Sequence, residues 1–170
     1  MVIKNDNLSM SRWHYMMIFC LLVLAALIYW PGLDSRFLLD DFSNLRDLDT
    51  IKNYGFPYFI FATDIAGPSG RPLSLVTFAL QHASWPNNPF DFKLVNLVIH
   101  LLNGFLIYII SVYLVGFFKQ DLYQKYIPII ATGLWLLHTI QLTTTLYVIQ
   151  RMTLLSSFFI LLGVLTYLSM

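Results

Sequence analysis

The sequence predicts an all-α polytopic membrane protein, and both its composition and the spacing of its apolar residues indicate this class. Of its 170 residues, 58% are hydrophobic and 11% are charged, whereas soluble domains carry about 25% charged residues. The apolar residues gather in stretches close to the ~20 residues that a helix needs to cross a bilayer. The net charge is +1 and the basic residues are dispersed, so no nucleic-acid partner is expected.

Four stretches predict membrane-spanning helices: residues 13–30, 94–118, 126–142 and 154–170. The first ends in Tyr29 and Trp30, which suits an interfacial aromatic belt better than a cleaved signal peptide. The third is short, and Pro128 stands at its start, where a missing N–H costs little. Because the chain stops at the fourth stretch, we expect an incomplete N-terminal portion of a longer protein. A complete four-span protein is the alternative.

Basic residues predict the orientation of these spans. Lys4 and Arg12 precede the first span, and Lys119 and Lys125 lie between the second and third. Positive residues in short loops stay on the cytoplasmic side. The N-terminus is therefore expected inside, with a long outer loop over 31–93 and a second outer segment over 138–152, both facing one compartment.

Turn-forming residues divide the long outer loop into short elements. The stretches "GFP" and "AGPSGRP" predict turns, and "YFIFATDI" between them suits either a short strand or an interfacial helix. After Pro72 the apolar spacing predicts a helix, too short to span and expected along the membrane interface.

Polar residues on the second span share one helix face. Asn96, His100 and Asn103 recur at spacings of four and three, which predicts hydrogen bonds to neighbouring helices. A metal site is less favoured, since the histidines show no H-x-x-x-H or H-E-x-x-H spacing.

Charged residues near the outer ends leave several interpretations open. The stretch "FLLDDF" places Asp40 and Asp41 side by side. Three interpretations of this acid pair are open: an active site, a helix cap, or the solvated end of a membrane segment. Arg151 stands at the outer end of the fourth span and either extends to lipid headgroups or binds a phosphate. Arg71 either pairs with a loop aspartate or contacts a phosphate.

Three segments, in order, resemble one family. They are "FLLDDFSNL", "GRPLSLVTFALQHASWPNNPFDFKLVNLVIHLLNGFLIY" and "LWLLHTIQLTTTLYVIQRMTLLSSFFILLGVLTYL". Together they resemble the N-terminal membrane half of the protein O-mannosyltransferases with transmembrane and tetratricopeptide-repeat regions. The "VIQRM" form is most similar to the bacterial relatives, which include pilin-type glycosyltransferases. The resemblance runs from about Phe37 to Leu168 and implies that residues 1–170 form an N-terminal GT-C-like membrane module, a partial GT-C fold.

The resemblance also implies an activity and a set of site residues. Such enzymes transfer a sugar from a polyprenyl-phosphate carrier to a protein or glycan acceptor at the outer face of the membrane. The family's acid pair falls on Asp40 and Asp41, and its substrate- or phosphate-binding residues fall on Arg71, His138 and Arg151. Thr139 and Thr143 stand where animal members carry a His-Pro proline and a glutamate, so a second carboxylate from this segment is not expected.

These expectations also cover partners, cofactors and localisation. The partners are the lipid-linked donor, the acceptor and membrane lipids, and the location is a bacterial inner membrane with a periplasmic active-site loop. Either an arginine or a divalent metal would stabilise the leaving phosphate, although no metal-binding residues are singled out. The alternative function is a non-catalytic truncated membrane protein or a small assembly or transport subunit.

Overall fold

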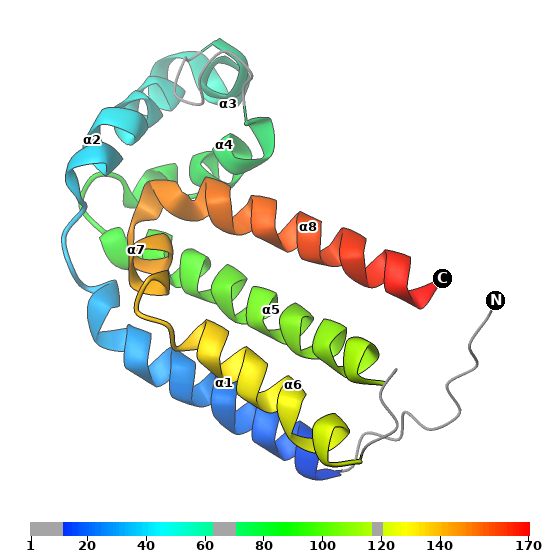
Figure 1. The fold of residues 1–170 in the computed structure, drawn as a ribbon. Coiled ribbons are helices and arrows are strands. Elements are labelled where there is room, and N and C mark those ends of the chain that lie inside the picture. Colours follow the sequence, from blue (N-terminus) through cyan, green and yellow to red (C-terminus); the bar gives the residue numbers. More distant parts are fainter. Residues whose placement is uncertain (1–11, 63–70, 117–120) are drawn as a thin grey trace.

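The computed structural model describes residues 12–62, 71–116 and 121–170, and every regular element within these ranges is helical. The all-α prediction is therefore confirmed over this part of the chain. Four long helices form a bundle, and short helices fill the connections at one end (Figure 1). The elements are α1 (Arg12–Leu33), α2 (Leu39–Leu45), η1 (Arg46–Thr50), α3 (Ile51–Ala62), α4 (Pro72–Ala79), η3 (His82–Ser84), α5 (Pro89–Val115), α6 (Asp121–Leu136), α7 (Gln141–Leu146), η4 (Val148–Gln150) and α8 (Arg151–Ser169).

Within the described part of the chain, three helical segments are long and apolar enough to cross a membrane: Arg12–Leu33, Pro89–Val115 and Val148–Ser169. They correspond to the first, second and fourth predicted spans. The third predicted span, 126–142, overlaps α6 only over residues 126–136, and the 16 residues of α6 fall short of the roughly 20 that a crossing requires. The structure is therefore consistent with an integral membrane protein, and within the described residues it supports three of the four predicted spans as candidates by length and composition.

The long helices alternate in direction. In Figure 1, α1 and α6 run toward the end that carries α2 and α7, and α5 and α8 run away from it. We call this the loop end of the bundle, since residues 34–62, 71–88 and 137–150 lie there. The two segments predicted to face one compartment thus meet at the same end of the helices.

Helix α5 lies at the centre of the bundle and contacts α1, α6 and α8. Its polar face is buried, as the spacing predicts. The Asn103 side chain donates to the Leu154 carbonyl of α8 at 3.0 Å. The His100 Nε2 lies 3.2 Å from the Leu136 carbonyl of α6. Gly104 lets α6 approach closely, because a Cβ at this position would overlap the buried Leu136 side chain.

The carboxyl end of α6 is capped by side chains from two other helices. The Leu136 carbonyl accepts from the Tyr29 hydroxyl at 3.2 Å and faces His100 Nε2, which must carry the proton because a carbonyl only accepts. The last carbonyls of a helix have no partner within it, and in an apolar environment each one left unpaired is costly. This capping explains how α6 ends inside the bundle.

The long connection between α1 and α5 folds on a hydrophobic core of its own. This core joins side chains of the connecting helices to the first turns of α5 and α8; its central members are Phe37, Phe78, Trp85, Phe92, Val148 and Met152. Helix α3 is kinked at Gly55 (φ 79°). Of the stretch "YFIFATDI" (residues 58–65), residues 58–62 are helical rather than extended, and residues 63–65 lie outside the described ranges. Pro72 opens α4 as predicted.

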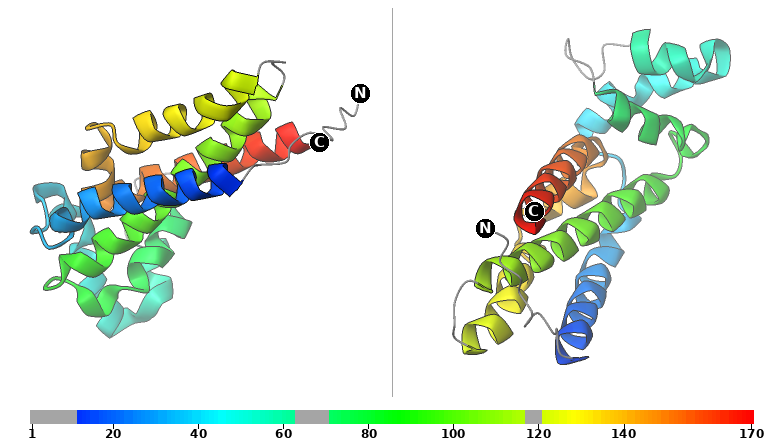
Figure 2. Two further views of the ribbon diagram at one scale, coloured as in Figure 1. Left: turned by 90° about the horizontal axis from the view of Figure 1, so that it is seen from below. Right: turned by 90° about the vertical axis from the view of Figure 1, so that its right-hand side faces the viewer.

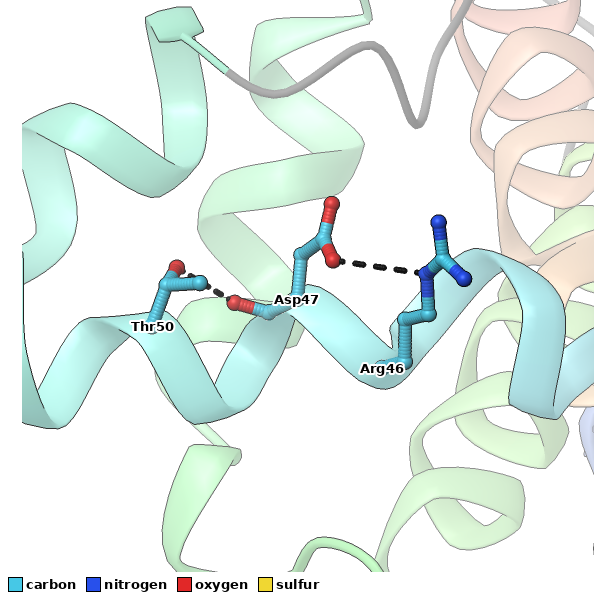
Figure 3. A network of polar contacts seen from close by, with 3 residues as sticks. All are labelled: Arg46, Asp47 and Thr50. Carbon is cyan, nitrogen blue, oxygen red and sulfur yellow. Dashed lines mark hydrogen bonds and ion pairs between the residues drawn. The ribbon is translucent and has the colours of Figure 1, made fainter.

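Along η1, one turn is stabilised by contacts within the element. The Arg46 Nε lies 3.6 Å from the Asp47 carboxylate, and the Thr50 hydroxyl donates to the Asp47 carbonyl at 2.6 Å (Figure 3). Because Arg46 is largely exposed, this ion pair adds little stability and belongs to the solvated surface of the loop end.

Candidate functional site

The two adjacent acids lie at the start of α2, and they differ in their surroundings. Leu38 is the N-cap residue, and Asp41 occupies the third helical position. The Asp41 Oδ2 accepts from the Leu38 backbone N–H at 2.9 Å. A carboxylate here satisfies an N–H that the helix leaves unpaired and suits the positive end of the helix dipole. The helix-cap interpretation is thus confirmed for Asp41.

Asp41 also ties the outer loop to the segment that precedes α8. Its side chain is fully buried, and its Oδ1 accepts from the Ile149 backbone N–H at 2.9 Å. Burial raises the pKa of Asp41, although hydrogen bonds from the backbone of residues 38, 148 and 149 and the charge of Lys93 oppose the rise. With both oxygens engaged and no exposed surface, Asp41 is a structural residue in this arrangement.

Asp40 is the exposed member of the pair. Its backbone N–H donates to the Tyr147 hydroxyl at 3.1 Å, and its carbonyl accepts from the Asn44 amide at 2.7 Å. These bonds hold its backbone while the carboxylate remains at the surface beside Tyr147. Desolvation raises the pKa of Tyr147 and the Asp40 carboxylate raises it further, while the bond from the Asp40 backbone N–H opposes the rise. Tyr147 therefore remains a neutral phenol at neutral pH.

Arg151 occupies a closed site that the sequence did not predict. The guanidinium donates to the Asn96 Oδ1 at 2.9 Å, to the Phe92 carbonyl at 2.8 Å and to the Thr77 carbonyl at 3.2 Å. It also lies over the ring of Phe78, 4.5 Å from the centroid, and has no exposed surface. The interpretation that Arg151 extends to lipid headgroups is wrong for this structure, because its donors are used inside the protein.

The enclosure of Arg151 also leaves no surface through which it would meet a phosphate from outside. Its partners belong to α4 and α5, so the side chain joins these two helices to the first turn of α8. Asn96 completes the junction, since its amide donates to the Tyr147 and Val148 carbonyls at 3.0 and 3.3 Å. We therefore assign Arg151 a positioning role.

Arg71 is the N-cap residue of α4 and is exposed. Its Nη1 lies 3.1 Å from the sulfur of Met152, the second residue of α8. Among the described residues no aspartate forms an ion pair with it, and Asp64 lies outside them. Because thioether sulfur is a weak acceptor, this contact leaves most of the donor capacity of Arg71 available.

His138 lies in the turn between α6 and α7 and is exposed. Its Nδ1 accepts from the Ile140 backbone N–H at 3.2 Å. The segment 147–152 contacts three of the predicted residues: Asp40 through Tyr147, Asp41 through Ile149 and Arg71 through Met152. His138 shares no such contact within the described chain, so its phosphate-binding role stays a prediction.

The sequence analysis did not identify two residues that are important in this region, Lys93 and Tyr147. Lys93 is fully buried, and its Nζ donates to the Ser35 and Arg36 carbonyls at 2.6 and 3.0 Å. It thereby holds the linker that leads from α1 to the acid pair. A lysine directly before a predicted span was the available signal. Tyr147 gave none, because nothing local indicates a contact with a residue more than 100 positions away.

The described residues contain no group of three or more potential metal-ligating side chains among His, Cys, Asp and Glu. Comparison with protein-family models, with curated proteins and with solved structures found no match to this chain. The chemistry of the loop end must therefore be argued from its own residues.

Proposed function

We propose that this chain is a membrane module of a glycosyltransferase that takes a sugar from a polyprenyl-phosphate carrier, with a protein or glycan as acceptor. The family resemblance suggests this activity, and one structural observation carries it further. An exposed acid, Asp40, and an exposed arginine, Arg71, both contact the segment 147–152 at one end of the bundle. The reaction needs these two kinds of group at a membrane surface.

In the proposed reaction, an acceptor hydroxyl or amide attacks the anomeric carbon of the sugar. The new bond forms as the bond from that carbon to the carrier phosphate breaks, so the configuration inverts. Asp40 takes the acceptor proton as general base, and the phosphate leaves with the bonding electron pair. Arg71 stabilises the developing charge, because its planar fork of N–H donors suits phosphate oxygens.

The remaining predicted residues take different parts in this proposal. Asp41 and Arg151 position the site, through the Ile149 N–H and through the junction with α4 and α5, respectively. His138 is a candidate for a second phosphate contact. A divalent metal is an alternative source of charge stabilisation. The membrane is proposed to be a bacterial inner membrane, with the N-terminus in the cytoplasm, α6 completing a fourth crossing and the loop end in the periplasm.

The test is sugar transfer from a polyprenyl-phosphate-linked donor by membranes that contain the whole natural protein. We expect Asp40→Asn to lower transfer by about 10²–10⁴-fold, the usual contribution of a general base, while crosslinking to a photoreactive polyprenyl phosphate is unchanged. Arg71→Ala is expected to weaken that crosslinking. Asp49→Asn, at an exposed acid of η1, is the matched control and should retain full transfer.

Near-normal transfer by Asp40→Asn would overturn its role as the base. If Asp41→Asn alone abolished transfer while the variant stayed folded, the buried acid would instead be the reacting group. Absence of transfer and of carrier crosslinking in the unmodified protein would favour the alternative function, a non-catalytic membrane subunit.

A further inference from the structure

Helix α3 carries an exposed aromatic face that the proposed reaction does not use. Tyr54, Phe56 and Tyr58 expose 65%, 42% and 44% of their surfaces. The rings of Tyr54 and Tyr58 lie against each other, with centroids 4.8 Å apart. Tyr54 and Tyr58 form an exposed aromatic pair, whereas the ring of Phe56 lies against His82 of η3 with centroids 5.4 Å apart. Exposed apolar side chains that lie together mark interaction surfaces. Each tyrosine also has a polar hydroxyl at the end of an apolar ring.

The position of α3 in the fold indicates which partner this face meets. Figures 1 and 2 show α3 and α4 at the side of the bundle, level with the first turns of α8 and not beyond the ends of the long helices. Helix α4 contacts both α3 and α8, so this placement is fixed by packing. The loop ends of the three candidate spans mark the level of the lipid headgroups. Helix α3 therefore lies at that level.

We propose that α3 lies in the headgroup layer of the bilayer and that the Tyr54–Tyr58 pair is its anchor. Tyrosine suits this layer, because its ring is apolar and its hydroxyl reaches water or headgroups. The exposed Leu80 at the end of α4 (74%) adds apolar surface to the same pair of helices. The partner is a phospholipid surface, and the inference depends on the membrane spans but not on sugar transfer.

Anchoring α3 has a consequence for the candidate site. Arg71 is the N-cap residue of α4, and α4 packs against α3. A lipid contact through α3 would therefore hold Arg71 at a constant depth, at the level where the phosphate of a membrane lipid lies.

The experiment measures the depth of single positions in the full chain, reconstituted in phosphatidylcholine–phosphatidylglycerol vesicles. Cys20 is the single cysteine, so Cys20→Ser provides a background for Tyr54→Cys or Tyr58→Cys carrying a nitroxide. We expect collisions with lipid-soluble oxygen, relative to a water-soluble nickel chelate, to be several-fold more frequent at 54 and 58 than at the control Asp49→Cys on the neighbouring η1.

Three results would overturn the inference. Equal accessibility to the chelate at 49, 54 and 58 would place the face in water, and protection from both reagents would indicate a protein partner. If the substitutions prevent folding, the unmodified chain is exposed to a phospholipid with a photoreactive headgroup. Crosslinks within residues 51–60 are then expected, and their absence, with crosslinks elsewhere at the loop end, would be the third contradicting result.

Discussion

Helices α5 and α8 are both apolar enough to span a membrane, yet the protein buries them very differently. In an apolar stretch of 18 residues within each candidate span, 44% of the residues are buried in the span of α5 but only 11% in the span Val148–Ser169, which contains α8. Helix α5 turns Asn96, His100 and Asn103 toward its neighbours, and all three are fully buried. On α8 the buried residues are Arg151, Met152 and Leu154, all in its first turn.

The difference shows that α5 is fixed along its length, whereas α8 is fixed mainly at its start. Hydrocarbon tails are as apolar as leucine side chains, so apolar residues alone do not draw helices together in a bilayer. Close backbone approach and hydrogen bonds do, and α5 supplies them at Gly104, His100 and Asn103. On α8 the strongest ties gather around Arg151. Three predictions separate these two modes of attachment, and a fourth tests the burial of Asp41.

The largest effect is expected for Arg151→Leu. This change removes four hydrogen bonds and leaves Asn96 Oδ1 and the Phe92 and Thr77 carbonyls without their donor. Each buried acceptor left unpaired costs about 1–3 kcal/mol, so thermal unfolding in detergent micelles should report a large fall in Tm. Phe159→Ala, on the exposed face of α8, is the control and should change Tm little. Equal effects would mean that α8 is not held mainly at its start.

A smaller effect is expected for Gly104→Val. The new side chain would overlap the buried Leu136, and overpacking a tight contact costs about 1–3 kcal/mol. Gly163→Val on α8 is a matched control, since a Cβ there meets nothing within 4 Å. Unfolding in micelles should separate the two variants, and an unaffected Gly104→Val would show that α5 and α6 are not closely packed here.

Asn103→Leu tests one interhelical hydrogen bond on the α5 face. It removes the donor to the Leu154 carbonyl, and such bonds in membrane proteins contribute about 0.6 kcal/mol on average. The control is Leu102→Ala, at an exposed position one residue away. A loss as large as that of Arg151→Leu would contradict the ranking proposed for the two helices.

The smallest effect is a pH dependence at Asp41. Because burial raises its pKa in the folded state, the folded protein holds a proton that the unfolded chain has released above about pH 4. Stability should therefore fall modestly as pH rises from about 4 through the raised pKa, and then level off. Unfolding measured across this range should show the slope in the unmodified chain and in Asp40→Asn, but not in Asp41→Asn. A slope of opposite sign would mean that the hydrogen bonds to Asp41 outweigh its burial.

The sequence predicted some features of the site and could not predict others. The cap at Asp41 and the buried face of α5 depend on neighbours three or four positions away, and helical periodicity makes such neighbours predictable. The roles of Lys93 and Tyr147 depend on contacts with Ser35 and Asp40, 58 and 107 positions away, respectively. No local pattern encodes those contacts.

By itself the sequence determined the helical class, three candidate spans and the meeting of the two loop segments, because bilayer thickness and helical periodicity act locally along the chain. Only the tertiary structure decided which acid is buried, that Arg151 is enclosed while Arg71 is exposed, and that α6 ends at a carbonyl capped by Tyr29 and His100. These outcomes depend on which segments pack together at the loop end, since burial and hydrogen bonding are properties of the assembled fold.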